Sequence, residues 1–132
     1  MTRPAVRLSE DLRQKIIDHC LAELPNEGCG LLAMEGDRVV EVYPTENLDR
    51  SPVGYTIPPE EHFAALTDAE SHGWSLGGVF HSHPNGQARP SMTDVRAALE
   101  PDWAYLIVGL GDDPVVRAWS IREGQIEAVG LV

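Results

Sequence analysis

The chain has few of the residues that characterise disulfide-rich scaffolds and cysteine-based sites. Only two of its 132 residues are cysteine, Cys20 and Cys29, and they form no Cys-x-x-Cys pair. Two thiols in a domain of this size fit the reducing cytosol. We expect both to be small buried residues. Because Cys29 lies near the residues discussed below, a reactive role for its thiol stays open.

Positive charge is also scarce. The chain has 10 Lys and Arg against 21 Asp and Glu, which gives a formal net charge of −11. Non-specific binding of nucleic acid needs clustered basic residues, so this composition argues against a nucleic-acid partner. No apolar run approaches the length of a membrane span, and the N-terminus lacks the apolar core of a signal peptide. We therefore expect a cytoplasmic protein with no membrane partner.

The length and the spacing of apolar residues predict one domain over residues 1–132. A first helix is expected after Ser9, closed by Pro25, and a second over residues 60–72, ended by Gly73. A third helix is expected from Ser91 to about Leu99. Strands are expected at residues 29–34, 38–43, 76–83, 104–108, 115–121 and 125–129, with an extended segment at 55–57. This order predicts an α/β (α+β) fold, a mixed β-sheet flanked by helices.

Two histidines close the strand predicted at residues 76–83. The side chains of His81 and His83 share one face, because residues two apart on a strand point the same way, and Ser82 points to the other face. Pro84 cannot continue the ladder and begins a loop rich in turn residues. The sequence therefore places two imidazoles side by side at the end of a strand.

The segment after this loop has the form of a helix start. Ser91 is the predicted N-cap, and Asp94 follows three residues later, in the first helical turn. Asp94 can then turn its carboxylate back toward His81 and His83. Three ligands are typical of a catalytic zinc site, which leaves one position open for water and lowers the pKa of that water to about 7. Glu27, where a helix gives way to a strand, is the candidate base.

These residues resemble the JAMM (MPN+) zinc metalloproteases, which include deubiquitinating isopeptidases. The pattern of that family is an upstream Glu, then His-x-His-Pro, six residues, Ser, two residues and Asp. It is matched here, spacing included, by Glu27, His81, His83, Pro84, Ser91 and Asp94. The resemblance spans nearly the whole chain, and the segment 78–86 looks most like the compact bacterial and archaeal members. It implies a single MPN/JAMM-like domain with a cytidine-deaminase-like architecture.

The resemblance also implies a function. His81, His83 and Asp94 would bind one Zn²⁺ per chain, Glu27 would act as general acid/base, and Ser91 would help to stabilise the oxyanion. Members of the family typically cleave an amide or isopeptide bond after the C-terminal Gly-Gly tail of a ubiquitin-like protein, and bacterial types process sulfur-carrier proteins, including removal of a cysteine adduct. The segment 53–58 is a candidate edge strand for such a tail. Relatives often pair, so a homodimer is possible.

The sequence also allows comparison with two other functions. A non-catalytic MPN-type binding or scaffold module is the main alternative, against which the intact ligand set argues. A nucleobase deaminase needs His-x-Glu followed by Pro-Cys-x-x-Cys, and the chain has neither.

Several residues have a plain structural explanation beside the functional one. Ser91 caps a helix whether or not it acts in catalysis. Arg89 either meets a substrate carboxylate or is simply exposed, and Trp103 either borders a substrate groove or packs in the core. The substrate-binding residues themselves are not identifiable from the sequence.

Overall fold

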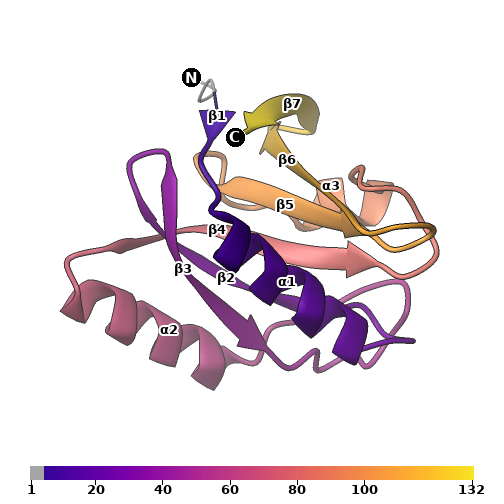
Figure 1. Ribbon diagram of the computed structural model, residues 1–132, viewed down its shortest axis with the longest axis horizontal. Helices are drawn as coiled ribbons and strands as arrows, with labels where there is room; N and C mark the ends of the chain where they lie inside the picture. The colour runs from indigo at the N-terminus through magenta and orange to yellow at the C-terminus, as the bar shows by residue number, and fades with distance from the viewer. Residues whose placement is uncertain (1–4) are drawn as a thin grey trace.

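A seven-stranded mixed sheet runs through the molecule, with helices on both of its faces (Figure 1). The computed structural model describes residues 5–132. The elements in chain order are β1 (Ala5–Val6), α1 (Glu10–Ala22), β2 (Cys29–Glu35), β3 (Arg38–Thr45), α2 (Pro59–Ser71), β4 (Ser75–His83), α3 (Met92–Ala97), β5 (Ala104–Gly109), β6 (Val115–Arg122) and β7 (Gln125–Leu131). The strands lie in the order β1-β7-β6-β5-β4-β2-β3. The pairs β4–β5 and β1–β7 are parallel and the other neighbours are antiparallel.

Helix α1 begins where the sequence predicts and ends earlier. The Ser9 hydroxyl accepts a hydrogen bond from Leu12 N at 3.3 Å, and Ile16, Ile17 and Cys20 are buried. The helix stops at Ala22, so the prediction that Pro25 closes it was wrong by about one turn. Leu24 lies in the following turn and is 43% exposed.

Strand β4 divides the core between the two faces of the sheet. Phe80 belongs to one hydrophobic cluster, which includes the buried face of α1, and Val79 belongs to a second cluster, against which Val95 of α3 packs. The first cluster requires a glycine in the adjacent strand, because a Cβ on Gly30 would lie 2.3 Å from the Phe80 ring. The alternation along β4 therefore builds both halves of the core.

Helix α3 is shorter than predicted. It ends at Ala97, two residues before the expected end at Leu99. The Tyr105 hydroxyl accepts from Glu100 N at 3.2 Å and donates to Glu100 O at 2.8 Å. These bonds fix residue 100 against β5, which explains why the helix does not continue toward Pro101. The predicted end of α2 is confirmed by Gly73, whose φ is +77°.

Two further differences concern strands. Strand β1, which pairs with β7, was not anticipated. The segment 55–57 is not a strand of the sheet, and the segment 53–58 is a loop. The strands predicted at residues 29–34 and 38–43, and at 115–121 and 125–129, form the antiparallel hairpins β2–β3 and β6–β7. Within residues 5–132, no helix combines the length and apolar character needed to cross a bilayer.

Candidate metal centre and active site

Three metal-ligating side chains converge at the end of β4. The His81 Nε2 atom lies 3.1 Å from Asp94 Oδ1, and His83 Nε2 lies 3.0 Å from Asp94 Oδ2. The two Nε2 atoms are 3.2 Å apart. One ligand atom from each residue lies within 4.8 Å of the others. The sequence prediction that these residues share one site is thus matched by their geometry.

The local structure explains how Asp94 reaches the histidines. Ser91 caps α3 in a capping box: its hydroxyl accepts from Asp94 N at 3.1 Å, and Asp94 Oδ2 accepts from Ser91 N at 2.9 Å. The carboxylate is therefore held on the same side as the chain entering the helix. Its side chain is 9% exposed, so it faces the end of β4 and not the solvent.

The donor atoms fit a small divalent cation. With zinc–ligand bonds of about 2.0–2.1 Å, the corners of a tetrahedron lie about 3.3 Å apart. The two Nε2 atoms, 3.2 Å apart, are close to that edge length, and each lies 3.0–3.1 Å from a different oxygen of the Asp94 carboxylate. The His83 Nδ1 atom lies 2.8 Å from Gln87 O. A proton held on Nδ1 by that carbonyl leaves the lone pair of Nε2 directed at the cation position.

The three groups shift one another's pKa. Burial would raise the pKa of Asp94, but hydrogen bonds from His81 and His83 outweigh it and hold that pKa far below the usual range. Burial lowers the pKa of His81 in spite of Asp94. Burial also acts to lower the pKa of His83, but Asp94 outweighs it and raises the value. An ionised carboxylate beside two imidazoles is the charge arrangement that binds a cation.

Glu27 lies beside these ligands, at the entrance to β2. Gly28 N donates to Ser82 Oγ at 2.8 Å and Ser82 N donates to Gly28 O at 3.0 Å, which places Glu27 next to the strand position between the two histidines. The side chain is buried, and its Oε1 atom makes no hydrogen bond within residues 5–132. Burial raises the pKa of Glu27 from 4.5 to about 7, with His83 opposing and Asp94 reinforcing the shift. Glu27 thus combines an unpartnered oxygen with a pKa near neutrality.

Two residues at the site were missed by the sequence analysis. Tyr55 stacks on His81 with ring centroids 4.7 Å apart and planes inclined by 24°. Asn47 is buried and donates to Glu27 O at 3.1 Å. Both lie in the irregular segment between β3 and α2, where no periodic pattern indicates which side chains turn inward. The only available signal was the presence of an aromatic residue and an asparagine in that segment.

The other residues considered from the sequence have structural roles or lie at the surface. Cys29 is buried and burial raises the pKa of its thiol to about 11, so it stays protonated at neutral pH. Trp103 packs against the second hydrophobic cluster. Arg89 is exposed and its guanidinium lies 5.5 Å from the centre of the Trp119 ring.

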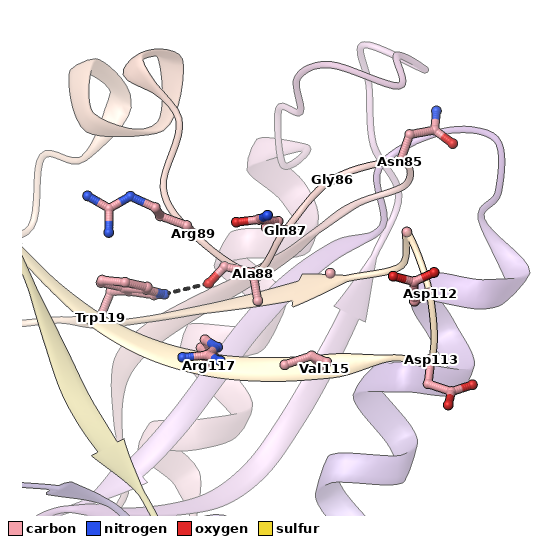
Figure 2. A pocket seen from close by; sticks show the side chains of 12 residues that line it. Asn85, Gly86, Gln87, Ala88, Arg89, Asp112, Asp113, Val115, Arg117 and Trp119 are labelled. Atoms are coloured by element: carbon pink, nitrogen blue, oxygen red, sulfur yellow. Dashed lines mark hydrogen bonds between the residues drawn. The ribbon is translucent and has the colours of Figure 1, made fainter.

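The loop that joins β4 to α3 is tethered to β6. Trp119 Nε1 donates to Ala88 O at 2.9 Å, as Figure 2 shows. Beside this contact lies a cavity of about 680 Å³, lined by the loop, the end of β5 and the start of β6. Arg89 and Arg117 lie near Trp119, with Asp112 and Asp113 at the other end (Figure 2). The loop that carries Gln87, the partner of His83, is therefore anchored from its outer side.

Comparison with known proteins agrees with this geometry. A family model of prokaryotic homologues of the JAB domain matches residues 9–122. The chain is 33% identical over 127 residues to a desampylase of Haloferax volcanii, covering 91% of each chain. It is 34% identical over 128 residues to a CysO-cysteine peptidase of Mycobacterium tuberculosis, covering 92% of this chain and 88% of that one. A probable TtuB-protein conjugate cleaving protease of Thermus thermophilus is 42% identical over 109 residues, which are 81% of this chain and 70% of that one.

Solved structures share the fold. A solution structure of a Desulfitobacterium hafniense protein matches with a TM-score of 0.88 and 36% identity, covering 96% of this chain and 91% of that one. A JAB1/MPN domain protein from Archaeoglobus fulgidus matches with a TM-score of 0.64 and 20% identity, covering 98% of this chain and all of the other. The predicted MPN/JAMM-like fold is confirmed.

Proposed function

The chain belongs to the family of prokaryotic homologues of the JAB domain, and from this premise we propose that it is a zinc-dependent peptidase acting on the C-terminal Gly-Gly tail of a ubiquitin-like or sulfur-carrier protein. It is a hydrolytic enzyme, as its named relatives are. One observation carries the proposal: a three-ligand cluster of His81, His83 and Asp94 lies beside Glu27, whose buried Oε1 has no hydrogen-bond partner in the described part of the chain. We keep the cytoplasmic location and the single domain over residues 1–132 as predictions.

We assign the metal ligands to His81, His83 and Asp94. Zinc bound by them supplies a Lewis acid that polarises a carbonyl and activates water at neutral pH. The chain contributes one carboxylate and two neutral imidazoles, so the ligands leave one net positive charge on the ion. Three protein ligands also leave a coordination position open to the reactants.

Glu27 is proposed as the general acid/base. A base works best when its pKa is close to the working pH, and burial raises the pKa of Glu27 to about 7. In this role its free Oε1 accepts a proton from the attacking water and then delivers it to the leaving amine. The raised pKa suits both proton transfers, because Glu27 must first take up a proton from water and then release it to the amine.

Ser91 is proposed as a donor to the oxyanion. Its hydroxyl oxygen accepts from Asp94 N, and that bond leaves the hydroxyl hydrogen available to donate. The capping box fixes the oxygen in place, so the donor is positioned before substrate binds. Capping and oxyanion stabilisation are compatible uses of one hydroxyl.

The substrate class is inferred from the relatives. They are named desampylase, probable TtuB-protein conjugate cleaving protease and CysO-cysteine peptidase. Together with the family resemblance, these names favour hydrolysis of an amide formed by the C-terminus of a small carrier protein. We propose such a carrier as the protein partner, with no nucleic-acid or membrane partner, and pairing of two copies stays a prediction.

Mass measurement of products tests the proposal. The zinc-loaded protein is incubated with a carrier–cysteine adduct, a carrier–protein conjugate and a ubiquitin chain, and we expect release of an intact Gly-Gly terminus from at least one carrier substrate. Glu27→Gln is expected to lower turnover by about 10²–10⁴-fold while keeping one zinc per chain. Zinc binding without cleavage of any of these substrates by the parent protein would support the scaffold alternative instead.

A further inference from the structure

The segment between β3 and α2 is organised around one buried side chain. Asn47 lies in residues 46–57, which we term the Asn47 loop, and it is 7% exposed. Its amide nitrogen donates to Glu27 O at 3.1 Å and to Gly54 O at 3.0 Å. Its amide oxygen accepts from Asp49 N at 3.0 Å and from Thr56 N at 3.1 Å. Four hydrogen bonds use both donors and both acceptor positions of a primary amide.

The Asn47 loop holds the main chain of Glu27 on both sides. Glu27 N donates to Ser51 O at 2.9 Å, and Glu27 O accepts from Asn47. Within residues 5–132, the buried Oε1 atom of Glu27 accepts no hydrogen bond. The position of that oxygen therefore depends on the backbone contacts, and two of those come from this loop.

The same loop places an aromatic ring on a metal ligand. Asn47 binds the two neighbours of Tyr55, accepting from Thr56 N and donating to Gly54 O. Leu48 N also donates to Thr56 O at 2.9 Å, which closes the base of the loop. Tyr55, held between these bonds, stacks on the buried ring of His81. One amide thus connects the backbone of Glu27 with the ring that covers His81.

We propose that Asn47 is a positioning residue that fixes the relative positions of Glu27 and His81 through the Asn47 loop. The inference rests on the proposed function, because it treats Glu27 as the acid/base and His81 as a ligand. Asparagine is required by the hydrogen-bond pattern: aspartate has the same shape but offers no donor to the two carbonyls of Glu27 and Gly54. A displacement of about 1 Å in a catalytic group lowers rates by up to about 10²-fold, so loss of the Asn47 hydrogen bonds should be detectable in the rate.

Asn47→Asp tests the two hydrogen bonds that Asn47 donates, in the zinc-loaded enzyme. We expect kcat to fall by about 10–10²-fold, with KM within about twofold and zinc still one per chain, because Glu27 acts on bound substrate and is not a ligand. Asn26→Asp is the matched control. It adds the same charge one residue from Glu27, at a side chain that makes no hydrogen bond within residues 5–132. The kcat of this variant should stay within about threefold of the parent. A folded Asn47→Asp enzyme with parental kcat overturns the proposal.

Hydrogen exchange of the metal-free protein gives a readout independent of activity. Glu27 N is bonded to Ser51 O, and Leu48 N is bonded to Thr56 O at the base of the loop. We expect both amides to exchange at least about tenfold faster in Asn47→Asp, because the loop loses its bonds to Glu27 O and Gly54 O. The amide of Leu106 in the central strand β5 reports global stability and should be unchanged. Equal acceleration at all three sites would mean general destabilisation and would refute a positioning role. If Asn47→Asp does not fold, Asn47→Ser serves for the same comparison.

The link to His81 has its own variant. Tyr55→Leu removes the ring and keeps the four hydrogen bonds of Asn47, and it should weaken zinc affinity by about tenfold, as loss of a residue that orients a ligand does. Tyr55→Phe keeps the stack and should restore parental affinity. Competition with a chromophoric chelator measures both. Parental affinity in Tyr55→Leu would break the proposed connection to His81. These binding and exchange measurements decide the inference even if no conjugate is cleaved, a result that would overturn the proposed function alone.

Discussion

The two faces of strand β4 differ in what their side chains do. On the α1 face, Phe80 is fully buried in a hydrophobic cluster, and Ser82 accepts a hydrogen bond from Gly28 N. On the opposite face, His81 and His83 present ring nitrogens to one carboxylate. Residues adjacent in sequence therefore serve packing and chemistry separately, because the pleat sends them to opposite sides.

The two faces also differ in how completely their polar groups are satisfied. Ser82 is bonded through both its hydroxyl and its amide. Glu27 retains a buried oxygen that has no partner among residues 5–132, and burial raises the pKa of this side chain to about 7. Unsatisfied buried groups reduce stability, and proteins retain them mainly at functional sites. Substitutions on the two faces should therefore have separable effects on metal binding and on folding.

The largest expected effect follows loss of a metal ligand. His81→Ala should reduce bound zinc from one per chain to a small fraction and abolish detectable hydrolysis, because two ligands hold zinc weakly. Its unfolding in chelator should stay close to that of the metal-free parent. Metal analysis after gel filtration, with His72→Ala as control, checks this. Retention of a full equivalent of zinc by His81→Ala would remove His81 from the ligand set.

The neighbouring residue should show the opposite behaviour. Phe80→Ala removes a fully buried ring, and such changes lower the free energy of unfolding by about 3–5 kcal/mol. Where the variant remains folded, its zinc content should match the parent. Chemical denaturation of metal-free protein measures the loss, and Phe80→Leu should lose less. A parental unfolding free energy in Phe80→Ala would contradict the division between the two faces.

Ser91 tests whether one hydroxyl serves both folding and catalysis. Ser91→Ala should lower kcat by about 10²–10³-fold if the hydroxyl donates to the oxyanion, and loss of the cap should reduce stability by about 1 kcal/mol. Ser91→Thr keeps a hydroxyl and should recover most of the parental kcat and most of the parental stability. A stability loss with kcat unchanged would reduce Ser91 to a helix cap.

The smallest effect concerns the pH dependence of stability in the metal-free protein. Glu27 has a pKa of about 7 when folded and 4.5 ordinarily, so it favours the folded state while protonated. That contribution is fully present below pH 4.5 and is lost as pH rises through 7. Glu27→Gln should therefore gain on the parent by about 1–2 kcal/mol between pH 5 and pH 8. Unfolding free energies of both proteins at the two pH values check this, and a constant difference would contradict the raised pKa.

The sequence was informative where a regular pattern links the position of a residue to the direction of its side chain. The alternation of β4 put His81 and His83 on one face, and the Ser91–Asp94 spacing predicted the capping box that the structure contains. The length of α3 was not predictable, because it depends on hydrogen bonds to Tyr105, which lies outside the helix. The periods of helices and strands indicate in which direction a side chain points. Contacts between separate elements leave no such periodic pattern in the sequence.

The Asn47 loop was not predictable for the same reason. Nothing in its sequence indicates that Asn47 is buried or that Tyr55 faces His81, since irregular backbone has no period to read. The burial that raises the pKa of Glu27 was equally invisible, although the family pattern selected the residue itself. A motif can thus name the reacting groups while leaving out those that fix their relative positions.

The burial of both cysteines matters for the proposed substrate class, because a sulfur-carrier protein would bring thiols to the enzyme. Cys20 and Cys29 are inaccessible, and burial raises the pKa of their thiols to about 12 and about 11. A thiol or persulfide released from a carrier protein therefore meets no thiolate on the enzyme with which to form a mixed disulfide. The same property leaves a cysteine introduced at the exposed Val53 as the one reactive thiol, a natural attachment point for a probe of the Asn47 loop.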